Sequence, residues 1–241
     1  MLNMKSVLHK SETRGHANHG WLDSHHTFSF AGYHDPERMY FGVLRVLNDD
    51  IVQGGMGFGT HPHDNMEIIS IPLKGELEHK DSMGNTHVIY ENDIQAMSAG
   101  TGIYHSEYNR NKEVLTNFLQ IWIFPNKTNV EPRYDQKSYD PQTLKNNFQQ
   151  ILSPNPEDAG VWIHQDVWFH RGTFEPGKST TYSLKKPGNG IYFFILEGSV
   201  EIEGQPLNKR DGYGVWEVEN INIKASTNSD ILVMEVPMEL N

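Results

Sequence analysis

The feature that most constrains the fold of this chain is an internal repeat. Residues 73–78 read Leu-Lys-Gly-Glu-Leu-Glu, and residues 196–201 read Leu-Glu-Gly-Ser-Val-Glu. In both copies a glycine separates two short strand-like runs, a pattern typical of a β-hairpin. The segment Asp-Gly-Tyr-Gly-Val-Trp at 211–216 also falls where residues 93–97 fall after the first hairpin. The repeat therefore predicts two units of the same fold, one in each half of the chain.

Strand-like runs separated by turn residues fill most of the sequence. Aliphatic, β-branched and aromatic side chains concentrate at 40–47, 67–73 and 117–124. We expect the Asn-Asp-Asp sequence at 48–50 to be the turn after the first of these runs. The 21 Gly and 12 Pro in 241 residues supply many further turn positions. These patterns predict an all-β protein of jelly-roll type.

A polar segment that contains several prolines separates the two units. It runs from Pro125 to about Gly160 and has at most a short helix near 143–151. We therefore divide the chain into three parts, since such composition is typical of a boundary between units. These are an N-terminal barrel at 1–125, a connecting segment at 126–160 and a C-terminal barrel at 161–241.

Composition limits the partners that the chain can bind. The formal net charge is -11, and no cluster of Lys and Arg occurs, so direct binding to nucleic acid or to an anionic membrane is disfavoured. We expect a small-molecule partner.

The absence of cysteine excludes disulfides and thiolate ligands. The N-terminus lacks the apolar core of a signal peptide, and no run of about 18 apolar residues occurs, so we expect a cytoplasmic protein.

Two short clusters, His61-Pro62-His63 and His105-Ser106-Glu107, carry the candidate chemistry. Side chains at i and i+2 of a strand point to the same face, so each cluster would aim two potential ligands into one interior. On neighbouring strands, facing side chains lie about 5 Å apart, close enough for one ion to bind all four groups. The predicted metal ligands are His61, His63, His105 and Glu107. This set suits Fe(II), Mn(II), Co(II), Ni(II), Cu(II) or Zn(II), but not Cu(I) or an iron–sulfur cluster.

Other interpretations of these residues stay open. A single His-x-His is common by chance in a chain with 13 histidines. Glu67 could be the carboxylate ligand instead of Glu107, because its spacing from His63 would put both on one face of a single strand. The segment His-Ala-Asn-His at 16–19 has ligand-like spacing only if it is helical, and the glycines on either side argue against a helix.

The repeat also predicts where the same ligands would recur in the second unit. The first histidine pair would fall between residues 178 and 186, and the second cluster near 221–224, but neither window contains a histidine. His164 and His170 lie too early in the sequence. We therefore expect a C-terminal barrel without metal ligands and one ion per chain.

The surroundings of the first cluster resemble the first cupin motif. That motif consists of Gly, five residues, His-x-His, three or four residues, Glu, about six residues and Gly. Here Gly55, Glu67 and Gly75 flank the histidines at 61–63 at comparable intervals. The interval from Glu67 to Gly75 is one residue longer than in the motif.

The second cluster resembles the second cupin motif, with Gly100 in place of its Pro and Ile94 in place of its leading Gly. Beyond cupins in general, the sequence resembles the pirin family, in particular its bacterial quercetinase-like members. The resemblance covers nearly the whole chain and is carried by Arg-Gly-His-Ala-Asn-His-Gly-Trp-Leu-Asp-Ser at 14–24, Gly-Phe-Gly-Thr-His-Pro-His at 57–63, Ser-Ala-Gly-Thr-Gly-Ile-Tyr-His-Ser-Glu at 98–107 and His-Gln-Asp at 164–166.

This resemblance implies a bicupin, with two cupin-type barrels in one chain, and favours Glu107 over Glu67 as ligand and base. It implies a metal-dependent dioxygenase of the quercetin 2,3-dioxygenase (flavonol 2,4-dioxygenase) type, with Fe(II) as the first choice of metal. A flavonol such as quercetin and O2 would be the substrates. Glu107 would take the proton of the 3-hydroxyl, and dioxygen would open the heterocycle with release of carbon monoxide and a depside.

Two other functions are compatible with an open site of histidines and a carboxylate. Some pirins are iron-dependent partners of transcription factors or metabolic enzymes, which implies a regulatory or redox-sensing protein with a protein partner and no catalysis. A structural metal in a cupin of the sugar-binding or isomerase type is the third hypothesis. An assay for flavonol consumption separates the first hypothesis from the other two.

Overall fold

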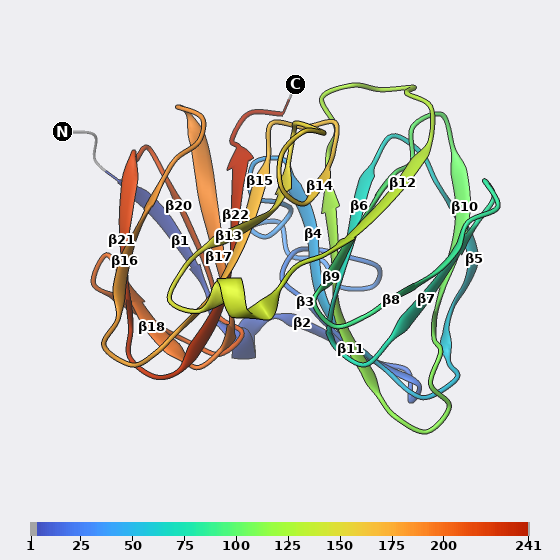
Figure 1. The fold of residues 1–241 in the computed structure, drawn as a ribbon, viewed down its shortest axis with the longest axis horizontal. Coiled ribbons are helices and arrows are strands. Elements are labelled where there is room, and N and C mark those ends of the chain that lie inside the picture. Colours follow the sequence, from blue (N-terminus) through green and yellow to red (C-terminus); the bar gives the residue numbers. More distant parts are fainter. Residues whose placement is uncertain (1–3, 241) are drawn as a thin grey trace.

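A computed structural model of the chain describes residues 4–240. Strands make up 57% of the chain and helices 3%, which confirms the predicted all-β class. The strands form two barrels that lie side by side (Figure 1). Each barrel is a sandwich of one seven-stranded and one four-stranded sheet.

The N-terminal barrel has sheets in the order β12-β9-β6-β11-β4-β3-β2 and β5-β10-β7-β8, and all of its neighbouring strands are antiparallel. The larger sheet consists of β2 Gly15–Asn18, β3 Leu22–His26, β4 Leu44–Val52, β6 Glu67–Lys74, β9 Asp93–Ser98, β11 Thr116–Ile123 and β12 Arg133–Ser138. The smaller sheet consists of β5 Gly57–His63, β7 Leu77–Asp81, β8 Thr86–Ile89 and β10 Ile103–Asn109.

The C-terminal barrel repeats this arrangement, with sheets in the order β1-β20-β17-β22-β15-β13-β14 and β16-β21-β18-β19. The larger sheet consists of β1 Lys5–His9, β13 Gln149–Ser153, β14 Val161–Trp162, β15 Trp168–Phe174, β17 Asn189–Glu197, β20 Gly212–Trp216 and β22 Ser229–Pro237. The smaller sheet consists of β16 Ser179–Ser183, β18 Ser199–Ile202, β19 Gln205–Asn208 and β21 Asn220–Ala225. The internal repeat of the sequence therefore corresponds to a repeated strand order.

Each large sheet includes a strand from outside its own half of the chain. β1 pairs with β20 in the C-terminal barrel, and β12, from the segment expected to connect the barrels, pairs with β9 in the N-terminal barrel. Within the described part of the chain, helical structure is limited to the 3-10 turns η1 Ser11–Thr13 and η2 Pro141–Leu144. The helix expected near 143–151 is therefore only the end of η2, and β13 begins at Gln149. Among residues 4–240, no helix has the length and apolarity needed to cross a bilayer.

The expectation of a turn at residues 48–50 is wrong, because β4 runs through all three positions. Their polarity has another origin. Asn48 and Asp50 are buried inside the barrel, where Asn48 Oδ1 lies 3.0 Å from His26 Nδ1 and Asp50 Oδ1 accepts a hydrogen bond from Ser24 Oγ. Polar residues persist in a buried strand when they have such partners.

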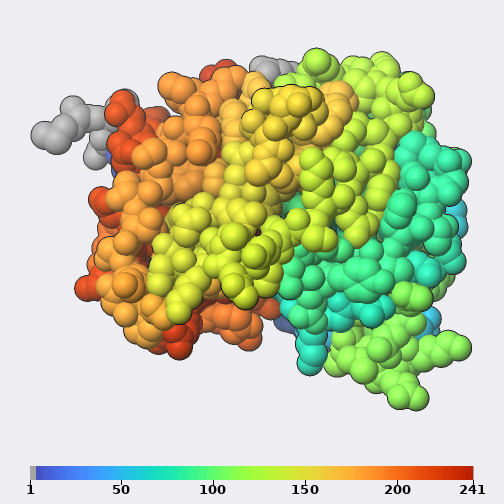
Figure 2. All heavy atoms as spheres, viewed as in Figure 1, coloured from blue at the N-terminus to red at the C-terminus, as the bar shows by residue number. Residues whose placement is uncertain are grey.

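The largest apolar cluster lies between the two large sheets. On β6, Ile69 and Ile71 belong to this cluster, whereas Ser70 points into the N-terminal barrel. This alternation follows from the two-residue period of a strand. Residues of β15, β17 and β22 complete the cluster, among them Phe169, Tyr192, Phe194, Leu232 and Met234. The segment expected to connect the barrels, at 126–160, is drawn in yellow-green and yellow and lies across the junction of the barrels (Figure 2).

The His-Gln-Asp segment at 164–166 lies at this junction. Gln165 Nε2 donates a hydrogen bond to the carbonyl oxygen of Phe124 at 2.8 Å, and the backbone N–H of Asn126 donates to the carbonyl oxygen of His164 at 2.7 Å. These bonds tie the end of the first barrel to the start of the second.

Candidate metal centre

The two clusters identified in the sequence lie on neighbouring strands of the four-stranded sheet. β5 and β10 are antiparallel, with His61 directly opposite His105 and His63 opposite Ile103. β5 is the edge strand of this sheet, a position that tolerates Pro62 because proline cannot donate to the sheet ladder. Three of the predicted ligands are thereby brought onto one face of one strand pair.

The donor atoms of the three histidines converge. One nitrogen from each of His61, His63 and His105 lies within 4.8 Å of the others, and His61 Nε2 and His105 Nε2 are 3.0 Å apart. His61 Nδ1 lies 2.7 Å from the carbonyl oxygen of Gly59. A hydrogen bond donated to that carbonyl leaves the Nε2 lone pair of His61 directed at the other two rings. Converging imidazole nitrogens of this kind fit a divalent transition metal.

Burial keeps two of these rings neutral. The pKa of His63 is lowered to about 4, first by burial and then by the neighbouring His105 and His61. The pKa of His105 is lowered to about 3, first by burial and then by His61 and His79. At neutral pH both rings therefore offer lone pairs instead of positive charge, which is the form that binds a metal.

Glu107 is buried beside the histidines and held by two hydrogen bonds. Its Oε1 accepts from Ser70 Oγ at 2.8 Å and its Oε2 from Gln120 Nε2 at 2.5 Å. Each oxygen keeps a second lone pair. The carboxylate lies within 4.8 Å of donor nitrogens of His105 and His79, a different set from the three-histidine group. Glu107 is therefore placed to accept a proton or to complete a ligand set.

His79 on β7 is a potential ligand that the sequence analysis did not single out. It lies opposite Glu107 in the β7–β10 pair, is fully buried, and has its Nε2 3.1 Å from Asp81 Oδ2. The sequence did contain a signal. His79 and Asp81 have the same i, i+2 spacing on a strand as the two clusters on β5 and β10.

Glu67 lies on a different face from the site. The argument that His63 and Glu67 share a strand is wrong, because β5 ends at His63 and β6 begins at Glu67. On β6, Glu67 and Ile69 are two residues apart and therefore point to the same face. Ile69 packs between the barrels. The carboxyl group of Glu67 accepts a hydrogen bond from Ser98 Oγ at 2.7 Å, and burial raises its pKa to about 7.

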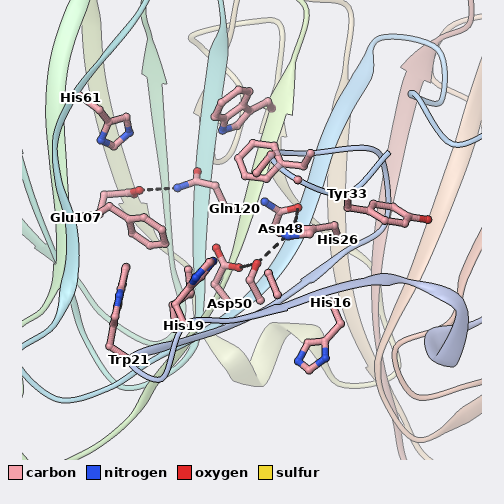
Figure 3. Close-up of a pocket in the computed structure, with 18 of the residues that line it drawn as sticks. His16, His19, Trp21, His26, Tyr33, Asn48, Asp50, His61, Glu107 and Gln120 are labelled. Carbon is pink, nitrogen blue, oxygen red and sulfur yellow. Dashed lines mark hydrogen bonds between the residues drawn. The ribbon is translucent and has the colours of Figure 1, made fainter. Parts of the chain in front are cut away.

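A cavity of about 790 Å³ extends from the histidines into the N-terminal barrel. His61, His63 and Glu107 line one end of it, and Gln120 lies next to Glu107 (Figure 3). Cavities of this size take drug-sized ligands. Aromatic side chains form much of the remaining wall, namely Trp21, Phe30, Tyr33, Phe58 and Trp122.

Comparisons with known proteins identify the family. The family model described as Pirin matches residues 7–123, and the model described as the quercetinase C-terminal cupin domain matches residues 150–236. The chain is 42% identical to the quercetin 2,3-dioxygenase of Escherichia coli strain K12, over 95% of this chain and 98% of that protein. The chain belongs to the pirin family.

A further pirin relative and a crystal structure of a pirin support the fold and the metal. The pirin-like protein of Caulobacter vibrioides is 38% identical, over 92% of this chain and 95% of its own length. The crystal structure of the bacterial pirin YhhW from Escherichia coli in complex with nickel(II) has a TM-score of 0.91 and 40% identity, covering 97% of this chain and 99% of that one. The predicted bicupin fold is confirmed. Together with the histidine cluster, the nickel complex of a pirin indicates a site for a divalent metal.

A second group of possible ligands lies on the β2–β3 hairpin, where His16 is directly opposite His25. Donor atoms of His16, Asp23 and His25 lie within 4.8 Å of one another, and His16 Nε2 is 2.7 Å from Asp23 Oδ1. Residues 16–18 lie in β2, so the segment at 16–19 is not the helix that its ligand-like spacing would require. Because His16 and Asp23 are both exposed to solvent by more than a third, this group is a hydrogen-bonded His–Asp pair on the surface with a neighbouring imidazole.

Proposed function

We propose that this pirin is a quercetin 2,3-dioxygenase that opens a flavonol ring with O2, and that His61, His63, His105 and Glu107 hold its metal. The observation that carries the proposal is the convergence of three histidines, two of which line a cavity with aromatic walls together with the buried carboxylate of Glu107. The names of relatives at about 40% identity point the same way. Fe(II) is our first choice of metal, with Ni, Zn, Mn, Co and Cu as alternatives of the same ligand preference.

A divalent transition metal bound there supplies a Lewis-acidic centre with open coordination positions. Glu107 is the general base of the proposal and accepts the proton of the flavonol 3-hydroxyl. Ser70 and Gln120 orient it, since each donates one hydrogen bond to a different carboxylate oxygen. A base fixed in this way loses little conformational entropy when substrate binds.

The cavity wall is suited to a flat aromatic substrate. Trp122 lies edge-on to His63 and to Phe30, with ring centroids 5.0 and 5.4 Å away, and Trp21 lies edge-on to Phe58 at 5.4 Å. Aromatic side chains packed against each other form rigid walls that contact a planar ring system over a large area.

The test is quercetin consumption, followed by its absorbance under air and under nitrogen, with metal content determined on the same samples. We expect the metal-loaded protein to consume quercetin only when dioxygen is present and to release carbon monoxide. A metal-loaded wild-type protein that consumes no flavonol under air would contradict the proposal.

A further inference from the structure

The interior of the N-terminal barrel contains a strip of polar side chains that begins at Gln120 and continues into residues that the proposed reaction does not use. Gln120 on β11 lies opposite Asn48 on β4, and Asn48 lies opposite His26 on β3. Two residues further along the same two strands, Asp50 on β4 lies opposite Ser24 on β3. All five line the cavity. Figure 3 shows His26, Asn48 and Asp50 grouped together, away from His61 and Glu107.

Hydrogen bonds hold this group in place. His26 Nδ1 lies 3.0 Å from Asn48 Oδ1 and 3.4 Å from Ser24 Oγ, and Ser24 Oγ donates to Asp50 Oδ1. Two polar atoms are left over. Among residues 4–240, the amide nitrogen of Asn48 and Oδ2 of Asp50 have no hydrogen-bond partner. Both side chains border the cavity, so both atoms are available to a ligand.

Asp50 can act as a hydrogen-bond donor. Its pKa is raised to about 7, chiefly by burial, with the hydrogen bond from Ser24 opposing the rise and the negative charges of Asp49 and Glu107 adding to it. At and below neutral pH a large share of this carboxyl group is therefore protonated. Together with the amide of Asn48, it presents neutral polar groups that can both donate and accept hydrogen bonds.

The strip leads away from the proposed base. Gln120 is hydrogen-bonded to Glu107, and neighbouring strands are about 4.8 Å apart, so the strip runs about 10 Å from Gln120 to His26. In a flavonol the 3-hydroxyl is on the carbon next to the one that bears the pendant ring. When the 3-hydroxyl faces Glu107, the pendant ring extends along the strip and its hydroxyl groups reach Asn48 and Asp50.

We propose that Asn48 and Asp50, held in place by Ser24 and His26, form a subsite that binds the hydroxyl groups of a substrate's pendant ring. The substrate class is flavonols with a hydroxylated pendant ring, and this assignment rests on the proposed function for the orientation of the 3-hydroxyl. Ser24 and His26 are positioning residues here. The subsite lies on a different sheet from the three histidines, so changes to it leave the metal ligands intact.

The test compares binding of quercetin, which has two pendant-ring hydroxyls, with binding of galangin, which has none. Dissociation constants are measured under nitrogen on metal-loaded protein by quenching of tryptophan fluorescence, since Trp21 and Trp122 line the cavity. Asn48→Leu and Asp50→Leu should each weaken quercetin binding by about three- to tenfold, the loss of roughly one neutral hydrogen bond. Galangin binding should change by less than about twofold.

Controls separate this loss from damage to the fold. Asp50→Asn keeps a neutral polar group and should bind both flavonols nearly as the wild type does. Asn222→Leu makes the same exchange on β21 of the other barrel, where the side chain is exposed, and should change neither constant. If Asp50→Leu does not fold, Asn48→Leu still decides the question.

Equal weakening of the binding of both flavonols in Asn48→Leu and Asp50→Leu, or no weakening of either in these two variants, overturns the subsite. A wild-type protein that binds neither flavonol overturns it as well. Failure of the proposed function is a different result: the wild type would then bind quercetin with the expected dependence on Asn48 and Asp50 but consume no flavonol under air.

Discussion

The two barrels have the same strand order but opposite interiors. In the N-terminal barrel, Ser70, Gln120 and Asn48 lie side by side on three neighbouring strands and point inward. In the C-terminal barrel, the corresponding row on β17, β22 and β15 consists of Phe193, Val233 and His170. Phe193 and Val233 belong to an apolar cluster of fifteen buried residues that fills this barrel.

The strands that carry the histidines in the first barrel show the same contrast. Their counterparts β16 and β21 fall in the windows at 178–186 and 221–224 where the repeat placed them. In those strands Tyr182, Ile221 and Ile223 are buried in the apolar cluster. Buried polar groups cost free energy unless they are hydrogen-bonded. We infer that the C-terminal barrel supplies stability and the N-terminal barrel supplies the site.

Removing a histidine ligand should have the largest effect. His61→Ala, His63→Ala or His105→Ala should empty the metal site and abolish flavonol turnover, because each deletes one of three converging nitrogens. Elemental analysis of purified protein should give one ion per chain for the wild type. His164→Ala, a half-buried histidine at the junction of the barrels, and His170→Ala should leave occupancy unchanged.

Two ions per chain in the wild type would contradict the contrast between an N-terminal barrel that binds one metal and a C-terminal barrel that binds none. His16→Ala tests one location for the second ion. Among residues 4–240, one group of candidate ligands does not include His105, namely His16, Asp23 and His25, and this variant removes a ligand from it. Retention of both ions in that variant would point to the C-terminal barrel and contradict its assignment as metal-free.

Changing the carboxylate should have the next largest effect. Glu107→Gln should keep much of the metal but lower flavonol turnover by a factor of about 10² to 10⁴, as is typical for the loss of a general base. Glu67→Gln is the matched control, since Glu67 is equally buried but faces the space between the barrels. This variant should lower flavonol turnover far less. Equal losses in the two variants, with metal retained, would remove Glu107 from its proposed role.

The sequence predicted the parts of this molecule that depend on local spacing. The i, i+2 spacing of the clusters at 61–63 and 105–107 was sufficient to predict two pairs of side chains that each share one strand face, and the repeat was sufficient to predict a second barrel without histidines at the positions that correspond to these clusters. The strand order that places His61 opposite His105 comes from long-range pairing, which no local pattern contains.

The errors have the same origin. The polar residues at 48–50 were interpreted as a turn because polar runs are usually exposed, but here the partners of Asn48 and Asp50 come from β3, far away in the sequence. Glu67 was placed on the face of His63 because nothing in the spacing showed that the chain turns between them. His79 was missed because its closeness to Glu107 depends on the pairing of β7 with β10.

A core substitution tests whether the C-terminal barrel contributes stability without contributing to the metal site. Phe193→Ala should lower the free energy of unfolding by about 3–5 kcal/mol, the usual cost of removing a fully buried phenylalanine. The metal content of the folded protein should stay the same, because Phe193 lies in the other barrel. Chemical denaturation and elemental analysis on one preparation test both statements. Loss of metal from folded Phe193→Ala protein would show that the two barrels are not independent in function.

The last prediction concerns the pH dependence of the stability of Asp50→Asn. The ionisable groups that face Asp50 in the barrel are His26 on β3 and Glu107 on β10, and Asp49 is next to it in the chain. The folded-state pKa of Asp50 is raised from 3.8 to about 7, chiefly by burial. Between these two values the folded protein keeps a proton that the unfolded chain has released, so this group lowers the free energy of unfolding as pH rises from about 4 to about 7.

Asparagine is neutral throughout this range, so the stability of Asp50→Asn relative to wild type should increase from pH 4 to pH 7 and remain level above it. The titration of His26 occurs in both proteins and cancels in the difference. Urea denaturation at several pH values measures that difference, and Glu201→Gln, at an exposed carboxylate on β18 of the other barrel, controls for the loss of one negative charge. A constant difference across the range would mean that Asp50 is ionised inside the barrel, and Asp50 would then serve the proposed subsite only as a hydrogen-bond acceptor.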